Sequence, residues 1–263
     1  MGATGTRAVG VDWSSGIWLA VVLDGGDYDE VTTHEHIEEV WESYGEAHTI
    51  LIDVPIGLVS EDHQREDGEE LERECDFLAR SAIGSRSSSV FTPPAREVAK
   101  IVASGDSHSQ VSQKNREITG KGPTQQAYSI SEGIAQVDDF LRADNRSDER
   151  ETLVESHPEV CFRAFAGSGL EHSKKTAPGY DERVEALANV VNSPETLVRQ
   201  ITTDLVDTSH EIDVDDVLDI LALTVASAGL PDQRQSLSSD SPDDATGLPM
   251  QIVYRANQPL DDS

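Results

Sequence analysis

The chain has 263 residues, of which 37% are hydrophobic, so it can bury the core of one large domain or of two small ones. Its 50 acidic and 20 basic residues give a formal net charge of −30, and the acids occur in every segment, as in proteins of extreme halophiles. In molar salt the Debye length is about 3 Å, so the net charge does not exclude a nucleic-acid partner if basic side chains line the site.

The two cysteines, Cys75 and Cys161, are too few for a disulfide framework or a four-ligand zinc site, and we expect both to be reduced and buried. The amino-terminal residues include neither a signal peptide nor an apolar stretch long enough to cross a bilayer. The sequence therefore predicts a cytoplasmic protein with no membrane partner, and it leaves the oligomeric state open.

The first part of the chain predicts a small sheet. Residues 6–12, 17–24 and 28–34 have the pattern of strands and are joined by short turns, which favours an antiparallel meander. An acidic helix is predicted over 35–45, and a buried strand over 48–54. The predicted order to this point is βββαβ.

A helical insertion is predicted over about 57–123, because this stretch is polar and has helical segments only at 69–81 and 96–103. Apolar residues then recur with the helical period over 125–141, and residues 153–155 are predicted to form a strand. Further helices are predicted at 158–166, 178–191, 194–202 and 214–228.

The composition changes near the end of the sequence. Residues 231–246 are rich in Ser, Asp, Gln and Pro, which predicts a flexible linker, and the tail 247–263 contains a possible edge strand at 250–254. The predicted architecture is a single α/β domain over 1–230, with the helical insertion inside it.

Acidic residues end three of the strand-like runs, namely Asp12, Asp53 and Glu155. Ligands of open α/β sheets bind at such strand ends, and an unpaired carboxylate beside a buried strand is costly. We therefore expect the three side chains to converge at one edge of the sheet. The alternative, that each is a solvated loop residue, is supported by the abundance of Asp and Glu in the chain.

The last predicted helix begins with more acids. Asp215, Asp216 and Asp219 lie in its first turns, and the i,i+3 spacing places the last two on one side. Their repulsion favours a bound cation, although the dipole of a helix N-terminus also favours acids. Magnesium prefers hard oxygen ligands, and two such ions about 3.5–4 Å apart can activate water and stabilise a leaving oxygen. The predicted Mg²⁺ or Mn²⁺ ligands are Asp12, Asp53, Glu155, Asp216 and Asp219.

Basic residues form a second group of candidates. Arg80 and Arg86 interrupt an acidic chain, and Lys174 and Lys175 are two of its five lysines. Arginine can bind phosphate with two parallel hydrogen bonds, and lysine binds it as a point charge. We expect these four side chains to contact substrate phosphates. Pairing of the two arginines with nearby acids is the alternative.

Other polar and aromatic residues have two interpretations each. His157 could act as a general acid or base, or it could cap the helix that follows it. Trp13 could flank a substrate base, or it could pack beneath the turn after its strand. His34 and His36 share a strand face but lack a third ligand, so no zinc site is expected there.

Several motifs together resemble the family called domain of unknown function 429, over roughly residues 8–229. These motifs are Gly10-Val-Asp12-Trp, Ile52-Asp53-Val-Pro-Ile-Gly57, Arg73-Glu-Cys-Asp76 with Arg80, Arg86-Ser-Ser-Ser-Val-Phe91, Glu155-Ser-His-Pro-Glu159, Ser173-Lys-Lys-Thr176 and Asp216-x-x-Asp219. The resemblance, to a haloarchaeal-type member, implies a predicted nuclease with a ribonuclease H-like mixed sheet of order βββαβαβα.

The last motif is similar to the helix of RuvC-type junction resolvases, except that Ile220 stands where alanine is usual. By that resemblance Asp12 is the first metal ligand, Asp53 or Glu155 the second, and Asp216 with Asp219 the last.

The activity expected from these observations is Mg²⁺- or Mn²⁺-dependent hydrolysis of a nucleic-acid phosphodiester by two metal ions. A binding module for nucleic acid or protein, without turnover, is the first alternative. Phosphoryl transfer to a small molecule on an actin-like fold is the second, and it is disfavoured because glycine-rich phosphate loops are missing from the sequence.

Overall fold

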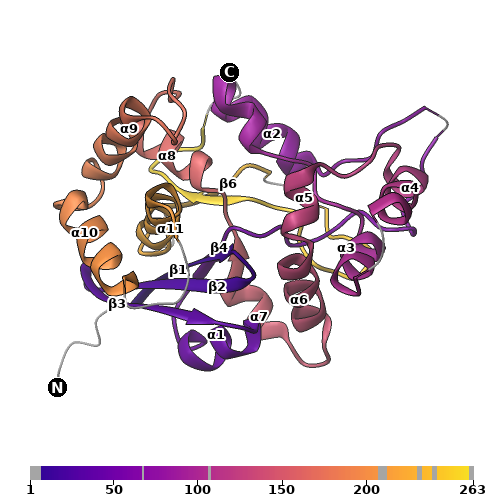
Figure 1. Cartoon of the computed structure of the whole chain (residues 1–263), viewed down its shortest axis with the longest axis horizontal. Coiled ribbons are helices and arrows are strands. Elements are labelled where there is room, and N and C mark those ends of the chain that lie inside the picture. The colour runs from indigo at the N-terminus through magenta and orange to yellow at the C-terminus, as the bar shows by residue number, and fades with distance from the viewer. Residues whose placement is uncertain are drawn as a thin grey trace.

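A computed structural model describes residues 7–66, 68–105, 108–206, 212–229, 233–238 and 242–260 of the chain (Figure 1). Its elements in chain order are β1 (Arg7–Ser14), β2 (Ile17–Asp24), β3 (Asp27–His34), α1 (Ile37–Tyr44), β4 (Ile50–Ile52), α2 (Glu74–Ile83), the 3-10 helix η1 (Gly84–Ser89), α3 (Arg96–Ala103), α4 (His108–Thr119), α5 (Gln125–Ser129), α6 (Ser131–Arg142), α7 (Ser147–Thr152), β5 (Leu153–Glu155), α8 (Pro158–Ala166), α9 (Ala177–Ala188), α10 (Pro194–Leu205), α11 (Val214–Ser227), β6 (Arg234–Ser236) and β7 (Val253–Arg255).

The central sheet has five strands in the order β3-β2-β1-β4-β5. The first three strands form the antiparallel meander that the sequence predicts, and β1, β4 and β5 are parallel. Val11 pairs with Ile52, and Ile52 pairs with Glu155, so the carboxyl ends of these three strands lie level at one edge. This register carries Asp12 and Asp53 to the same edge of the sheet. The predicted mixed α/β class is confirmed.

Helices cover both faces of the sheet, with α11 on one side and α1 on the other (Figure 1). Successive side chains of β2 point to opposite faces of the sheet and pack in two hydrophobic cores, one on each face. Leu19 and Val21 pack in the core of α8, α10 and α11, whereas Trp18 and Ala20 pack in the core of α1 and α6. None of the helices in the described ranges is long and apolar enough to cross a membrane.

Helix α11 packs directly on β1 at Gly10. A Cβ atom at this glycine would lie 2.6 Å from the Thr224 backbone nitrogen and 2.7 Å from the Ile220 carbonyl oxygen. Backbone atoms cannot move aside as a flexible side chain can, so only glycine allows this approach. The contact forms although isoleucine stands at position 220, and it holds the middle of α11 against β1.

We expect Gly10→Ala to lower the free energy of unfolding by about 1–3 kcal/mol, because overpacking of a close backbone contact costs this much. Chemical denaturation of the variant measures the change. Gly169→Ala is the matched control, since a Cβ there would meet no atom within 4 Å. Equal stability of the two variants would show that α11 does not depend on this contact.

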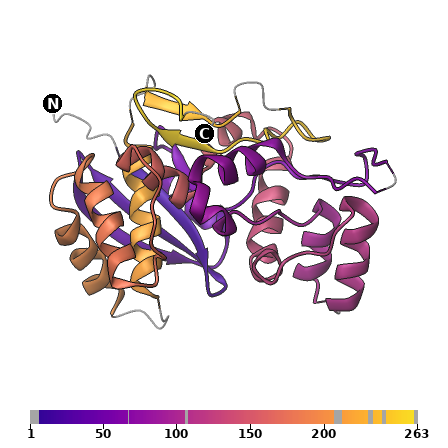
Figure 2. The same cartoon turned by 90° about the horizontal axis from the view of Figure 1, so that it is seen from above.

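Helices α3, α4 and α5, which follow β4 in the chain, form a separate layer around a small core of Val59, Ala95, Val98, Val111 and Ile118. This layer lies on the side of the sheet away from α9 and α10 (Figure 2). Helix α3 corresponds to the segment predicted at 96–103, whereas the sequence did not indicate α4, because that segment is polar with few apolar positions. The predicted 125–141 helix is divided at Ile130 into α5 and α6.

Other boundaries also differ from the sequence prediction. Helix α2 begins at Glu74 rather than at residue 69, and β4 is shorter than the predicted strand at 48–54. The short helix α7 was not predicted. The predicted helices at 158–166, 178–191, 194–202 and 214–228 are confirmed within a few residues as α8, α9, α10 and α11.

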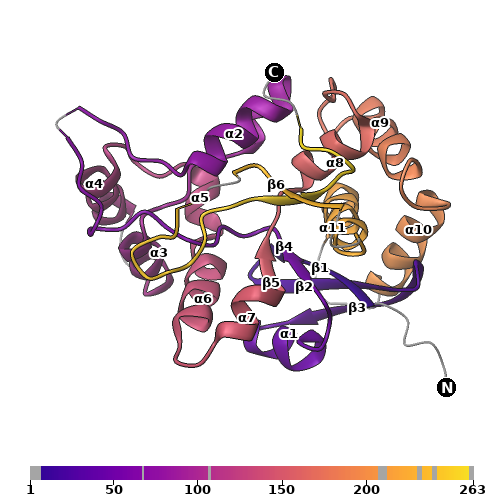
Figure 3. The same cartoon turned by 180° about the vertical axis from the view of Figure 1, so that it is seen from behind.

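The predicted linker is wrong for the parts of 231–246 that the structure describes, while 231–232 and 239–241 lie outside the described residues. Residues 234–236 form β6, which pairs with β7, so the edge strand predicted at 250–254 exists in part at 253–255. Val253 also bridges to Ser156 just after β5. In Figure 3 the segment 242–255, drawn in yellow, runs from the helical layer to the sheet.

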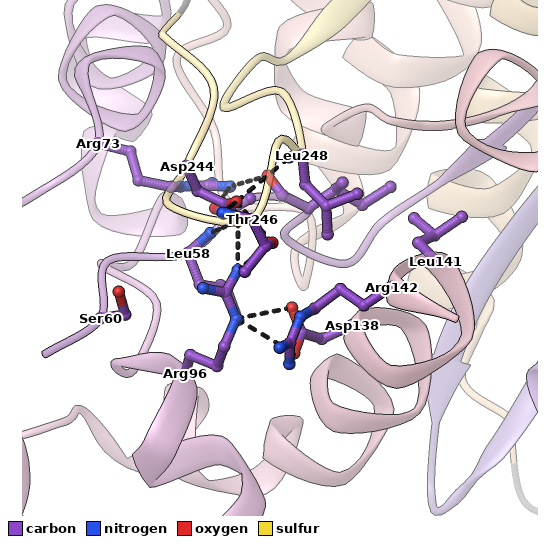
Figure 4. Close-up of polar contacts among 12 residues, drawn as sticks. Leu58, Ser60, Arg73, Arg96, Asp138, Leu141, Arg142, Asp244, Thr246 and Leu248 are labelled. Carbon is purple, nitrogen blue, oxygen red and sulfur yellow. Dashed lines mark hydrogen bonds and ion pairs between the residues drawn. The ribbon is translucent and has the colours of Figure 1, made fainter. Parts of the chain in front are cut away.

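Asp244 anchors this segment, and the residue is 5% exposed (Figure 4). It accepts hydrogen bonds from the Leu58 amide at 3.0 Å, from the Thr246 amide at 2.7 Å and from the Arg96 guanidinium. Arg96 also donates to Asp138 at 3.0 Å. Polar composition indicated a linker, but Asp244 is paired with Leu58 and Arg96, both more than 100 positions away, which the sequence pattern does not reveal.

Candidate functional site

All five of the predicted metal-ligand carboxylates, Glu155 included, line one cavity, here called the inner cavity, with a volume of about 160 Å³. Asp12 and Asp53 reach it from the ends of β1 and β4, while Asp216 and Asp219 reach it from the first turns of α11. The parallel strands and the close packing of α11 on Gly10 bring these side chains together. The expected convergence at one edge of the sheet therefore occurs.

A second, outer cavity of about 480 Å³ adjoins the first and shares Asp53, Asp216 and Asp219 with it. Its wall is polar and includes Ser88 and Ser89 at the end of η1, Asp215, Lys174 and Lys175. The carboxylates thus lie where the two cavities meet.

These carboxylates repel each other in a poorly solvated place. Burial, and then the charge of Asp53, raises the pKa of Asp12 well above its usual range. Burial, and then the charge of Asp219, raises the pKa of Asp53 in the same way. Burial raises the pKa of Asp219 to about 6, and it also raises the pKa of Asp216. The folded protein therefore favours protonated or cation-bound forms of these acids.

Lys174 provides the positive charge in the site. Its Nζ donates a hydrogen bond to Asp219 Oδ2 and lies 3.5 Å from Asp215 Oδ2. Burial lowers the pKa of Lys174, but the charge of Asp219 opposes this effect and the pKa is raised overall. The ammonium group is therefore charged at neutral pH and offsets part of the repulsion among the acids.

The donor set matches the chemistry of a divalent cation. No described residue donates a hydrogen bond to the side chains of Asp12 and Asp53, and Asp219 Oδ1 is buried without a hydrogen-bond partner among the described residues. Hard carboxylate oxygens of this kind are the ligands that Mg²⁺ and Mn²⁺ prefer. Among the same residues, however, no three His, Cys, Asp or Glu side chains are arranged around one point to hold an ion.

Glu155 has a different environment from the one predicted for a metal ligand. It is 4% exposed, and both of its oxygens accept hydrogen bonds from Arg73 at 2.7 Å. The Ile56 amide donates to the same carboxylate at 2.6 Å. Arg73 also pairs with Asp76, so its charge is shared between two acids. Glu155 lines the inner cavity, but its oxygens are already occupied; burial raises its pKa to about 7 in spite of Arg73.

The predicted phosphate contacts divide into two groups. Lys174 lines both cavities, and Lys175 lines the outer one with an exposed side chain. Arg80 instead pairs with Glu72 at 2.5 Å and donates to the Val90 carbonyl, and neither Arg80 nor Arg86 lines either cavity. The alternative of pairing with a nearby acid is therefore correct for Arg80.

His157 and Trp13, for which the sequence left two interpretations open, both have structural roles. His157 caps α8, because its Nδ1 accepts a hydrogen bond from the Glu159 amide at 3.2 Å. Burial lowers the pKa of His157, so the ring is neutral at neutral pH. Trp13 is 7% exposed and packs edge-on against Trp18 and beneath Gly133 of α6, although it also lines the inner cavity. His34 and His36 line neither cavity.

Asp76, Phe91 and Gln126 are among the residues of the inner cavity that sequence reasoning did not identify as site residues. Asp76 and Phe91 lie inside motifs that resemble those of the family, and this position in the motifs could have identified them as site residues. Gln126 lies in the first turn of α5, and nothing in its sequence context indicates that it would line a cavity at the strand ends.

Comparison with protein families matches residues 10–243 to the model described as "Protein of unknown function (DUF429)". Comparisons with curated proteins and with solved structures gave no match.

Proposed function

The chain belongs to the DUF429 family, and we propose that it is a Mg²⁺- or Mn²⁺-dependent nuclease with a ribonuclease H-like fold that hydrolyses phosphodiester bonds with two metal ions. The sheet order β3-β2-β1-β4-β5 supports the fold assignment. In it, β1, β2 and β3 form an antiparallel meander, and β4 and β5 are parallel to β1. The acids at the ends of β1 and β4 and at the start of α11 support the activity.

One observation carries the proposal: Asp12 and Asp53 face a cavity with no hydrogen-bond donor to their carboxylates among the described residues, and Asp219 Oδ1 is buried there without a partner. An isolated buried carboxylate is costly, and no packing role requires several of them at one place. Asp12, Asp53, Asp216 and Asp219 would hold the ions. Bound divalent ions would supply an activated water and stabilise the leaving oxygen.

The other residues of the site have supporting roles in this proposal. Lys174 and Lys175 are placed to attract phosphate groups into the outer cavity and to hold them near the acids. Ser14 donates a hydrogen bond to Asp216 Oδ2 at 3.4 Å and orients it. Glu155 fixes the Ile56 amide and Arg73, and so keeps the loop after β4 in place.

A non-catalytic binding module is the second candidate. The observation that favours it is the position of Lys174, which already neutralises Asp219, together with the lack of a three-ligand group among the described residues. In that case Lys174 would be a permanent partner of the acids, and the protein would bind neither Mg²⁺ nor Mn²⁺.

Titration of the protein with Mn²⁺ in molar KCl, followed by a nuclease assay, separates the two candidates. We expect calorimetric binding of Mn²⁺, cleavage that EDTA stops, and loss of both in Asp53→Asn. Asp181→Asn is the control, because Asp181 is exposed on α9 and lines neither cavity. Absence of Mn²⁺ binding by the wild type would refute the nuclease proposal and support the binding module.

A further inference from the structure

The two cavities that meet at the carboxylates differ in chemistry. The apolar side chains of the inner cavity include Val54, Val90, Phe91 and Ile130, whereas Pro158 is the one apolar residue among those lining the outer cavity. The outer cavity instead is lined by two serines, two lysines and six acidic residues, and in the proposed function bound divalent ions would offset the charge of these acids. A nucleic acid has this same division, with apolar faces on its bases and charge on its phosphates.

The inner cavity contains groups that suit one unpaired base. Phe91 is partly exposed and lines the inner cavity, so its ring is placed to stack on a base that enters it. Gln126 is exposed at the boundary of both cavities, and its side-chain amide makes no hydrogen bond within the described part of the chain. Proteins recognise unpaired bases by stacking on aromatic rings and by hydrogen bonds to base edges.

Size and closure limit what can enter. The inner cavity, about 160 Å³, has less than half the volume of the outer one and is too small for a base pair. Elements on several sides bound it: the sheet edge, α2, α5 and Ile252 of the 242–255 segment. Its remaining positive groups are Lys174 at the junction and Arg73, which is bound to two acids. A nucleic-acid backbone that continued through the inner cavity would therefore find no further basic side chain among its lining residues to bind the phosphates.

We propose that the substrate is a single-stranded nucleic acid whose terminal base enters the inner cavity, with the adjoining phosphates passing over the carboxylates into the outer cavity. This inference rests on the proposed function for its chemical step. In that step water forms a new P–O bond, one P–O ester bond breaks, and the leaving oxygen takes up a proton. The protein thus releases mononucleotides from a strand end.

Binding is tested without turnover, with Ca²⁺ in place of Mn²⁺ in molar KCl, by the fluorescence anisotropy of labelled oligonucleotides. We expect a single strand to bind at least tenfold more tightly than a blunt duplex of the same length. Phe91→Ala should weaken single-strand binding by about tenfold or more, as expected for the loss of one base stack. Phe77→Ala is the control, because Phe77 is an aromatic residue of α2 that is 59% exposed and lines neither cavity.

Cleavage assays with Mn²⁺ then test whether the protein requires a free strand end. Linear single strands should be degraded to mononucleotides, and covalently closed single-stranded circles should resist. Equal binding of single strand and duplex, an unchanged affinity of Phe91→Ala, or cleavage of circles as fast as linear strands would overturn the inference while leaving a nuclease. Phe91-dependent binding of single strands without any cleavage would instead refute the proposed activity and retain the base site.

Discussion

Replacing Asp12 with asparagine is expected to abolish cleavage while leaving the protein as stable as the wild type or more stable. The carboxylate of Asp12 faces Asp53, Asp216 and Asp219, and burial and these charges raise its pKa. Removing one charge relieves repulsion in the metal-free fold but deletes a ligand that the ions need. We expect a rise in Tm of about 2–4 °C, which corresponds to about 1 kcal/mol in a protein of this size.

The pH dependence of stability, compared between Asp12→Asn and the wild type, provides a further test. The pKa values of the site acids are raised on folding, to about 6 for Asp219 and about 7 for Glu155, so the folded state binds more protons than the unfolded state between about pH 4.5 and 7. Stability in EDTA should therefore fall as the pH rises through this window. Asp12→Asn should show a weaker fall. A clear loss of stability in Asp12→Asn, with no cleavage of single-stranded, duplex, hybrid or branched substrates by the wild type, would indicate a structural carboxylate.

Replacement of Arg73 by methionine should cause the largest loss of stability, about 3–5 kcal/mol at pH 7.5. The substitution leaves Glu155 and Asp76, which are 4% and 1% exposed, without the guanidinium that donates to both. Breaking a buried ion pair by removing one partner carries this cost. Urea denaturation measures the free energy. The loss should shrink near pH 5, since protonation of Glu155, whose pKa is about 7, removes one unpaired charge.

Arg80→Met is the matched control for Arg73→Met. The Arg80–Glu72 pair is partly exposed to solvent, and such pairs contribute at most about 1 kcal/mol. Because Arg80 lines neither cavity, its replacement should also leave nucleic-acid binding unchanged. Similar losses of stability in the two variants, at both pH values, would contradict the role assigned to Arg73.

The part of the site that could be predicted from sequence is the part set by local pattern. Asp12 and Asp53 follow apolar runs, and parallel pairing in a sheet places such strand ends together. Asp216 and Asp219 begin the most apolar helix of the chain, which had to be buried on the sheet. Each of these inferences needs only the periodicity of one element and one rule of sheet geometry.

The remaining part depends on partners far apart in sequence. Glu155 also follows a strand, yet Arg73, 82 residues earlier, binds both of its oxygens. Lys174 stands beside Asp219, 45 residues later, for reasons of tertiary packing alone. A carboxylate that holds a metal and one that holds an arginine have the same local pattern, so the sequence could not separate them.

The position of Asp244 in the chain has a consequence for protein synthesis. The ribosome makes the sheet and the helical layer first, and the Leu58 amide and Arg96 lack this acceptor until residue 244 has been added. Ile252, which completes the wall of the inner cavity, follows later still. A nascent chain can therefore fold its strands early, but its cavity is closed only after nearly all of these 263 residues have been translated.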